Sequence, residues 1–386
     1  MIQPADRISN VSEYYFSIKL KQIEKMRNEG ADVVNLGIGS PDQAPAPEVI
    51  KALQDAAPNP GFHGYQSYVG TPGLRKAFAD WYKRSYNVEL DYNTEILPMM
   101  GSKEAIMHIC MAFLNPGDEV LLPSLGYPTY TAVANLVSAK IRYFELKADD
   151  NWQPDLAALE NSDLSKVKMM WINYPNMPTG APAQQEVMEK IVAFCRKNNI
   201  LLVNDNPYSF VLNPNPTSIM SIHGFKEIGI ELNSLSKSHN MAGWRVGMAA
   251  SNAEFLQYIL RVKSNMDSGM FRPVQEAAIK ALSMGDAWYK ELNEGYTRRR
   301  ELVFQIMDLL KCEYDRNQTG LFVWARIPDT FKNGTEVSDI VLEKAHVFIT
   351  PGFIFGEAGE RYIRISLCTT EDKFRETIKR IQNIKF

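Results

Sequence analysis

The stretch Asn233–Gly247, "NSLSKSHNMAGWRVG", surrounds Lys237 with serines and a glycine and places Arg245 eight positions later. Most lysines lie on the surface among other charged side chains, and this one does not fit that setting. A desolvated lysine beside an arginine has a lowered pKa, and only a neutral amine attacks a carbonyl to form a Schiff base. The stretch therefore predicts a reactive amine at Lys237, with Arg245 available to bind a phosphate.

The sequence on both sides of this stretch indicates the fold. "EIGIEL" and "VGMAAS" predict two strands that flank Lys237. Upstream, short apolar runs such as "EVLLP", "KMMWIN" and "ILLVND" alternate with helical patterns such as "SKEAIMHICMAFL" and "QEVMEKIVAFCRKNN". Strands that alternate with helices are typical of an α/β fold with a mostly parallel sheet.

The pattern changes after about residue 266, where a long helical stretch leads to short strands such as "GLFVWARI" and "RYIRISLC". This change predicts a smaller α+β domain, against which the first 35 or so residues pack. We therefore expect a large domain over residues 36–265 and a small domain built from residues 1–35 and 266–386.

Composition excludes several classes of protein. The 386 residues carry a formal net charge of -3, so nothing points to a nucleic acid or membrane partner. No apolar run is long enough to span a membrane, and the first residues lack a signal-peptide pattern. The four cysteines have no CxxC spacing, and the five histidines are dispersed with no HExxH. We expect a cytoplasmic protein with reduced cysteines and no metal site.

Three further motifs precede predicted helices or end predicted strands. "GIGSPD" lacks the third glycine of a dinucleotide fingerprint, so it predicts a turn in which Gly39 lets the backbone approach a ligand. In "MMGSKEA", the free amides of a helix start suit a phosphate, although Ser102 could simply cap the helix. In "VNDNPY", Asp205 ends an apolar strand and is either a loop carboxylate or the partner of a buried cationic ring nitrogen.

The order of these motifs resembles that of the fold-type I pyridoxal-phosphate enzymes, and within them the class I/II aminotransferases. The resemblance extends from "NLGIGSPD" to "YIRIS", which is nearly the whole chain. It implies a seven-stranded, mostly parallel sheet in the large domain and pyridoxal 5'-phosphate as cofactor. It also implies a ping-pong reaction that moves an amino group from an amino acid to a 2-oxo acid.

The resemblance assigns roles around the cofactor ring. Lys237 matches the lysine that holds the cofactor aldehyde as an internal aldimine and later moves the proton from the substrate α-carbon. Asp205 matches the carboxylate that keeps the ring nitrogen protonated. Tyr208 matches the residue that hydrogen-bonds the phenolic oxygen, and Tyr127 matches the aromatic residue that stacks on the ring.

The resemblance also assigns a phosphate cradle, formed by Ser102, Lys103, Ser234 and Arg245. Lys103 would contribute mainly its backbone amide. Tyr65, in "HGYQSYVG", matches a tyrosine that reaches the phosphate of the neighbouring subunit, which implies a homodimer with shared active sites.

At the substrate end, Arg364 in "YIRIS" matches the arginine that binds the α-carboxylate in a forked geometry, and Gly39 would lend a backbone donor. One position departs from the family pattern. The motif usually reads Asn-Pro-Thr-Gly, but here Met177 precedes "PTG". Asn176, one position earlier, is a possible replacement for the missing asparagine.

Two other functions use the same residues. A lyase, decarboxylase or synthase on this fold would use the same cofactor for another outcome, and a non-catalytic binding protein would keep the fold alone. The missing asparagine leaves the first of these open.

The substrate side chain is less well defined. Tyr14, Tyr15 and Phe16 could line the pocket or pack in the core. Three arginines are candidates for reading a distal carboxylate, or are surface residues: Arg261, Arg272 and Arg326.

Overall fold

The protein is described by a computed structural model that covers residues 2–8 and 15–384. Its main sheet has seven strands in the order β2-β8-β7-β6-β5-β3-β4, and β8 alone runs antiparallel to its neighbours within this sheet. The strands are β2 (Ile96–Met99), β3 (Glu119–Pro123), β4 (Lys140–Phe144), β5 (Val167–Ile172), β6 (Leu201–Asp205), β7 (Gly229–Ser234) and β8 (Gly247–Ala250). The predicted α/β fold with a mostly parallel seven-stranded sheet is confirmed.

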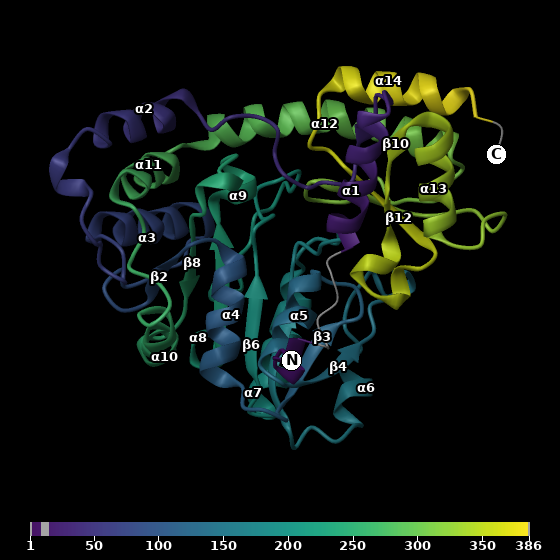
Figure 1. The fold of residues 1–386 in the computed structure, drawn as a ribbon. Helices are drawn as coiled ribbons and strands as arrows, with labels where there is room; N and C mark the ends of the chain where they lie inside the picture. The colour runs from purple at the N-terminus through teal and green to yellow at the C-terminus, as the bar shows by residue number, and fades with distance from the viewer. Residues whose placement is uncertain (1, 9–14, 385–386) are drawn as a thin grey trace.

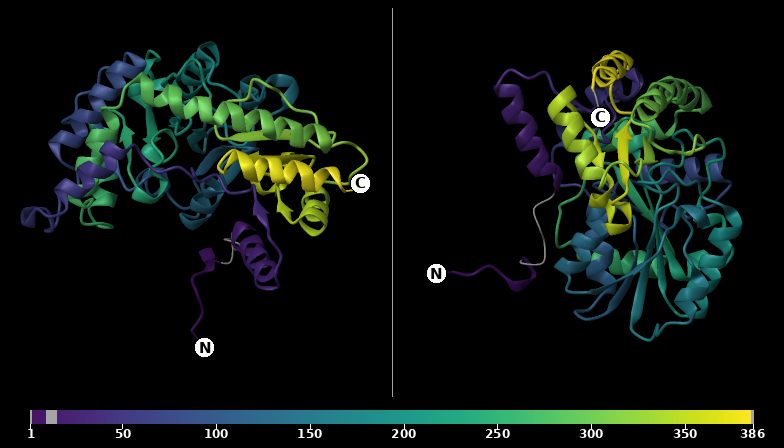
Figure 2. Two further views of the ribbon diagram at one scale, coloured as in Figure 1. Left: turned by 90° about the horizontal axis from the view of Figure 1, so that it is seen from above. Right: turned by 90° about the vertical axis from the view of Figure 1, so that its right-hand side faces the viewer.

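Helices cover both faces of this sheet, as the right-hand view in Figure 2 shows. Alternate residues of β5 belong to different apolar clusters: Met169 and Trp171 to one, Met170 and Ile172 to the other. Because side chains of a strand point alternately to opposite faces, a strand buried on both faces must be apolar throughout.

The first of these clusters packs against α4, α5 and α10. The helices of this part of the chain are α2 (Pro47–Ala56), α3 (Pro72–Tyr86), α4 (Ser102–Phe113), α5 (Pro128–Leu136), α6 (Leu156–Glu160), α7 (Gln185–Lys197), α8 (Phe225–Ile228), α9 (Leu235–Ser238) and α10 (Ala253–Lys263).

Local sequence explains where several helices begin. The Thr71 hydroxyl caps α3 by accepting a hydrogen bond from the Leu74 amide, and Pro72 occupies the first turn, where its missing N–H costs nothing. Pro128 plays the same part in α5. Before α4, Gly101 has φ 83°, a left-handed conformation that glycine adopts readily.

The second part of the molecule contains a three-stranded antiparallel sheet in the order β11-β12-β9. The elements of this second part are β9 (Phe322–Arg326), α13 (Gly334–Ala345), β10 (Val347–Phe348), β11 (Thr350–Pro351), β12 (Tyr362–Ser366) and α14 (Glu371–Gln382). The N-terminal elements α1 (Tyr15–Asn28) and β1 (Val34–Asn35) lie beside it, and β1 pairs in parallel with β10 (Figure 1).

Two helices connect these parts. The 24-residue α12 (Asp286–Leu309) runs along the top of the molecule in Figure 1 from α2 to α14. Before it, α11 (Arg272–Leu282) packs against α2 and α3. The division at residue 265 stays a prediction, and α11 lies beside elements that the prediction placed in the large domain. None of the helices in the described part of the chain is both long and apolar enough to cross a membrane.

Candidate active site

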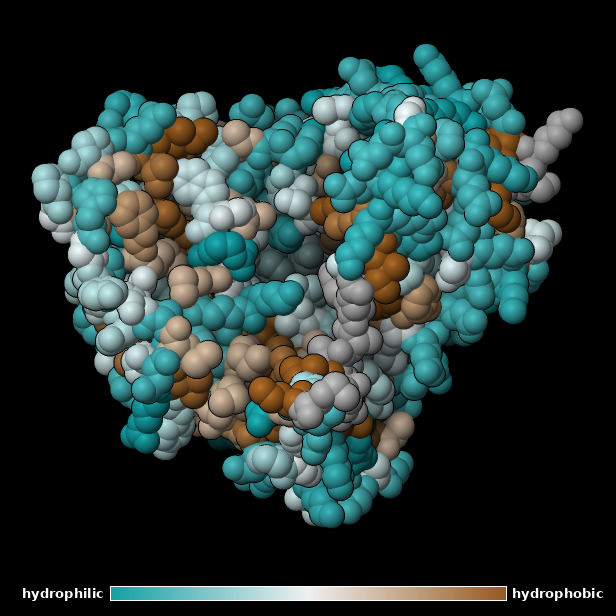
Figure 3. All heavy atoms as spheres, viewed as in Figure 1, coloured by the Kyte–Doolittle hydropathy of each residue, from teal (hydrophilic) through white to brown (hydrophobic). Residues whose placement is uncertain are grey.

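A cavity of about 550 Å³ lies where β5, β6 and β7 end, which is the edge at which open α/β sheets bind ligands. Figure 3 shows a hollow in the surface between α4 and α1. Most of the residues predicted for the site line this cavity: Gly39, Ser102, Lys103, Tyr127, Asp205, Tyr208, Ser234, Lys237, Arg245 and Arg364. They come from segments far apart in the sequence, so the fold alone brings them together.

Lys237 lies on α9, the short helix that follows β7 directly. Its Nζ donates a hydrogen bond to the Gly39 carbonyl oxygen at 2.6 Å. Burial lowers the pKa of the Lys237 ammonium, and the positive charges of Arg364 and Arg245 lower it further, against the opposing effects of Cys368 and Asp205. The cavity therefore favours the neutral, nucleophilic form of this amine.

Asp205 ends β6 and is almost completely buried. The Tyr130 hydroxyl donates to its Oδ2 at 2.9 Å, whereas Oδ1 is buried without a hydrogen-bond partner in the described structure. Burial raises the pKa of Asp205 to about 6, although the Tyr130 bond, the nearby Ser102 hydroxyl and the charge of Lys237 act to lower it. A buried oxygen without a partner is costly, so a ligand that offers a hydrogen-bond donor would be stabilised at this position.

The turn before α4 and Arg245 lie together at one end of the cavity, where the phosphate cradle was predicted. The Arg245 guanidinium donates to the carbonyl oxygens of Met100 and Ala242, at 3.2 and 2.8 Å. A Cβ atom at position 101 would lie 2.2 Å from Arg245 Nη2, so only glycine allows this approach. A helix N-terminus beside a guanidinium is a favourable environment for a phosphate.

Arg364 lies in β12, where its guanidinium packs between the rings of Phe322 and Phe355, at 3.8 and 4.4 Å from their centroids. Its Nη2 donates to the Gly37 carbonyl oxygen at 2.9 Å, and its Nη1 contacts the Met177 sulfur at 3.3 Å. Met177 therefore contacts Arg364, the arginine predicted to bind the substrate carboxylate, although it cannot donate a hydrogen bond. Gly39 lies close to Phe322, one of the two rings that flank Arg364, because a Cβ atom at position 39 would lie 2.3 Å from this ring.

Two predicted residues do not line this cavity. The Asn176 side chain turns into its own loop, where Oδ1 accepts a hydrogen bond from the Thr179 hydroxyl at 2.7 Å. It therefore does not replace the family asparagine in this structure. Tyr65 is 94% exposed, and the contact predicted for it is with another subunit.

Of the residues considered for the substrate side chain, those that the structure describes lie outside the cavity. The Tyr15 ring packs edge-on against Phe353, with a centroid distance of 5.2 Å, rather than in the cavity. Tyr14 and the side chain of Phe16 lie outside the described residues. None of the three candidate arginines lines the cavity, and each contacts another side chain: Arg261 the ring of Tyr258, Arg272 Glu276, and Arg326 Asp329.

Sequence reasoning missed several residues of the cavity wall. Tyr130 lies three positions after Tyr127 in "YPTY", so helical spacing could have placed it on the same side. Ser17 and Leu20 of α1 have the same spacing. Asn173 directly follows β5, so its position after an apolar strand could have indicated it. For Phe322 and Phe355 no local signal exists, because only the fold brings them here.

A lysine, a carboxylate and an arginine at the C-terminal edge of an open α/β sheet define a class of enzyme that handles amines and carboxylates. The comparisons with known proteins agree with this class. The aminotransferase class I and II family matches residues 31–381. LL-diaminopimelate aminotransferase from Halothermothrix orenii is 40% identical over 389 residues, covering 100% of both chains. The same enzyme from Aquifex aeolicus is 37% identical over 387 residues, again covering 100% of both chains.

Solved structures give the same result. The apo structure of BacF from Bacillus subtilis superposes with a TM-score of 0.95 at 35% identity, covering 100% of this chain and 99% of that one. An aminotransferase from Staphylococcus aureus superposes with a TM-score of 0.89 at 28% identity, covering 98% of both chains.

The chain belongs to the aminotransferase class I and II family, whose members are pyridoxal-phosphate enzymes. It is an aminotransferase, which moves an amino group from an amino acid to a 2-oxo acid. The predicted family and activity are confirmed, and the relatives do not favour the lyase, decarboxylase or synthase alternative or a non-catalytic binding protein.

Proposed function

We propose that this aminotransferase binds pyridoxal 5'-phosphate in the described cavity and uses Lys237 as its catalytic amine. The observation that carries the proposal is the convergence, in one cavity, of the Lys237 amine, the unpartnered Asp205 Oδ1 and the Arg245 guanidinium. These three groups match an aldehyde, a protonated ring nitrogen and a phosphate in turn. Asp205 would hold the ring nitrogen, and the turn at Ser102 with Arg245 would hold the phosphate.

When bound, the cofactor supplies an aldehyde and an electron-withdrawing ring that accepts the electron pair left when a proton leaves the substrate α-carbon. The chain's own residues do the rest. Once a substrate amine has displaced it, neutral Lys237 would take the α-proton and give it to the cofactor within the same half-reaction. In the second half-reaction the proton would move the opposite way, to the α-carbon of the new amino acid. Arg364 binds the substrate α-carboxylate, and its packing between Phe322 and Phe355 fixes the orientation of the guanidinium.

A homodimer with shared active sites is part of the proposal. Tyr65 is supported as a cross-subunit residue by its exposure and by its failure to line the cavity of its own chain. A reducing, cytoplasmic location agrees with the four cysteines, all of which are unpaired.

The amino donor is proposed to be an amino acid that Arg364 holds by its α-carboxylate. LL-diaminopimelate is the first donor to test, because the relatives named above act on it. An apolar amino acid is the second candidate, because Leu20, Ile38 and Phe355 line the cavity.

The absorption spectrum of the purified protein tests the proposal. Added pyridoxal 5'-phosphate should give a yellow band, and borohydride reduction should leave the cofactor covalently attached to the wild type and not to Lys237→Ala, as the mass of the denatured protein would show. Lys226→Ala is a matched control, because Lys226 pairs with Glu95 and does not line the cavity. Normal turnover by Lys237→Ala would refute the assigned role. For the wild-type enzyme, the ratio of the kcat/KM values for LL-diaminopimelate and phenylalanine decides between the two proposed donors.

A further inference from the structure

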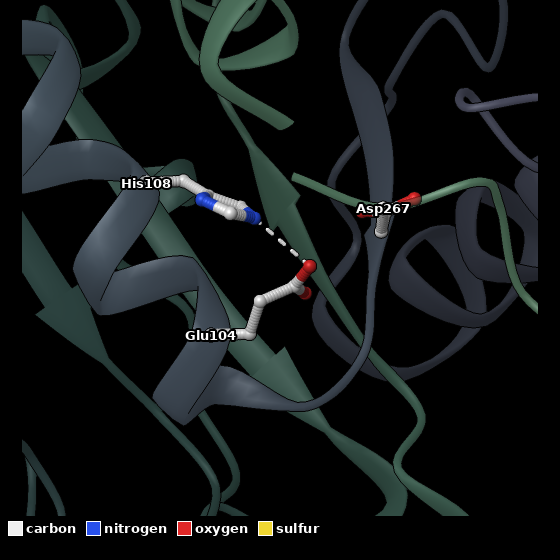
Figure 4. A group of neighbouring side chains, drawn as sticks. All are labelled: Glu104, His108 and Asp267. Atoms are coloured by element: carbon white, nitrogen blue, oxygen red, sulfur yellow. Dashed lines mark hydrogen bonds and ion pairs between the residues drawn. The ribbon is translucent and has the colours of Figure 1, made fainter. Parts of the chain in front are cut away.

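Four ionisable side chains form a cluster at the start of α4, outside the cavity. His108 Nε2 lies 2.9 Å from Glu104 Oε1, one helical turn away, and Asp267 faces both from the segment between α10 and α11 (Figure 4). Lys263 completes the cluster, because its Nζ donates to Asp267 Oδ2 at 2.6 Å. The side chains of His108, Lys263 and Asp267 are each at most 6% exposed, so this is a built arrangement and not a solvated surface.

The arrangement suggests a metal site at first sight, since the ligand atoms of Glu104, His108 and Asp267 lie within 4.8 Å of one another. However, the cluster already contains a cation, the Lys263 ammonium, on the oxygen that Asp267 would offer. A second cation there would meet electrostatic repulsion in a poorly solvated place. Both other carboxylate oxygens are also engaged: Glu104 Oε2 by the Met100 amide and Asp267 Oδ1 by the Gly269 amide.

One of these bonds connects the cluster to the cavity. The Met100 amide donates to Glu104 Oε2 at 2.6 Å, while the Met100 carbonyl oxygen accepts a hydrogen bond from Arg245. Met100 immediately precedes Gly101 and Ser102, the turn to which the phosphate is assigned. Both backbone polar groups of Met100 are therefore engaged. Glu104 binds its amide, and its carbonyl oxygen binds the Arg245 guanidinium.

The cluster also reaches the segment that carries Tyr65. Gly269, whose amide binds Asp267, has φ 84° and lies so close to the Gln66 backbone that a Cβ would stand 2.5 Å from its carbonyl oxygen. The same four side chains thus contact, directly or through one residue, the two chain segments assigned to the phosphate: the turn at 100–102 and the loop around Tyr65.

We propose that Glu104, braced by His108 and the Lys263–Asp267 pair, is a positioning residue that fixes the phosphate-binding turn. This inference rests on the proposed function of the cavity. The carboxylate does not touch the ligand. It accepts the Met100 amide and so keeps the helix start and Arg245 in the geometry that a phosphate requires, before any ligand arrives.

The test compares two ligands that differ only in the phosphate, pyridoxal 5'-phosphate and pyridoxal, by titrating the apo form of the full-length chain. Glu104→Ala should weaken binding of pyridoxal 5'-phosphate about tenfold, the value expected for one charge-assisted hydrogen bond, and change pyridoxal binding less than twofold. Glu104→Gln should recover most of the loss, because its amide oxygen can still accept the Met100 amide. Glu95→Gln, at the other end of β2, removes a carboxylate of the Lys226 pair and should change neither affinity.

Hydrogen exchange provides a second readout that does not depend on the ligand. The Met100 amide should exchange faster in Glu104→Ala than in the wild type and the Glu95→Gln control. An equal loss of affinity for both ligands, or no loss for either, would overturn the positioning role. So would tight Zn²⁺ binding that His108→Gln abolishes, because the cluster would then be a metal site. If wild-type apoprotein bound both ligands equally, the proposed phosphate site itself would be wrong, which is a different result.

Discussion

Replacing Tyr130 by phenylalanine tests the electrostatic description of the cavity. The hydroxyl of Tyr130 makes the one hydrogen bond found for the Asp205 carboxylate within the described residues, at 2.9 Å to Oδ2, and both residues are buried. The Tyr130 ring stacks on Trp171 with a centroid distance of 5.1 Å, and phenylalanine would keep that contact. The substitution therefore removes a hydrogen bond and little else.

The size of the effect follows from that bond. A hydrogen bond to a charged group contributes about 1.5–3 kcal/mol, and one pKa unit corresponds to about 1.4 kcal/mol. Burial already raises the pKa of Asp205 to about 6. Without the Tyr130 bond, we expect this pKa to rise by about one to two further units.

The sign of the stability change follows from linkage. An unfolded aspartate has a pKa of about 3.9. At pH values between about 3.9 and the native pKa, Asp205 is therefore ionised in the unfolded state and still protonated in the native state. Stability of the apoprotein therefore falls as pH rises from about 4 to about 6 in the wild type and then levels off. In Tyr130→Phe the fall should continue to about pH 7–8, an additional loss of about 1.5–3 kcal/mol.

Urea unfolding of the apoprotein at a fixed concentration, repeated from pH 5 to pH 9, measures this difference. Tyr143→Phe is the matched control, because the Tyr143 side chain is 53% exposed and its hydroxyl contacts only Thr131 among the described residues. If the wild-type and Tyr130→Phe profiles differed by the same amount at every pH, Tyr130 would not stabilise the ionised Asp205, and the reasoning would fail.

Three further substitutions test other parts of the site. Arg364→Lys should raise KM for amino acids about tenfold or more, because lysine cannot form the forked contact with a carboxylate. The same substitution should not change KM for amines that lack a carboxylate. Steady-state kinetics with the two kinds of substrate measures this difference. Gly101→Ala places a methyl group 2.2 Å from Arg245 Nη2 and needs an unfavourable φ, so titration should show weaker binding of pyridoxal 5'-phosphate. Asp42→Ala removes both acceptors of a two-pronged, largely buried pair with Arg299, with bonds of 2.6 and 3.0 Å, and should destabilise the chain by about 3 kcal/mol in urea unfolding; a change below about 0.5 kcal/mol would contradict it.

Much of the site was predictable because its chemistry is concentrated in short motifs. Asp205 ends an apolar strand, and Lys237 and Arg245 occur together in one stretch of small residues. Each motif lies at the end of a strand, and parallel strands place their C-terminal ends at one edge of the sheet. The alternation of strands and helices therefore determined both the fold class and the common location of these residues.

Local sequence failed where a side chain's direction depends on distant residues. Asn176 was a reasonable substitute for the missing asparagine, yet its side chain bonds to Thr179 in its own loop, and Met177 contacts Arg364 instead. Tyr15 lies two positions before Ser17 of the cavity wall, but the turn of α1 directs it to Phe353. A change of one position on a helix rotates a side chain by about 100°, which sequence proximity does not reveal.

The sequence by itself thus determined the sheet and the family, and it singled out Lys237 and Asp205 as candidate site residues, since these depend on patterns within a few residues of one another. Only the tertiary structure decided that Tyr130 supports Asp205, that Phe322 and Phe355 enclose Arg364, and that Glu104 connects a buried charged cluster to the Met100 amide. The physical reason is that burial and hydrogen-bond geometry depend on contacts between segments up to hundreds of residues apart, and those contacts exist only after the chain has folded.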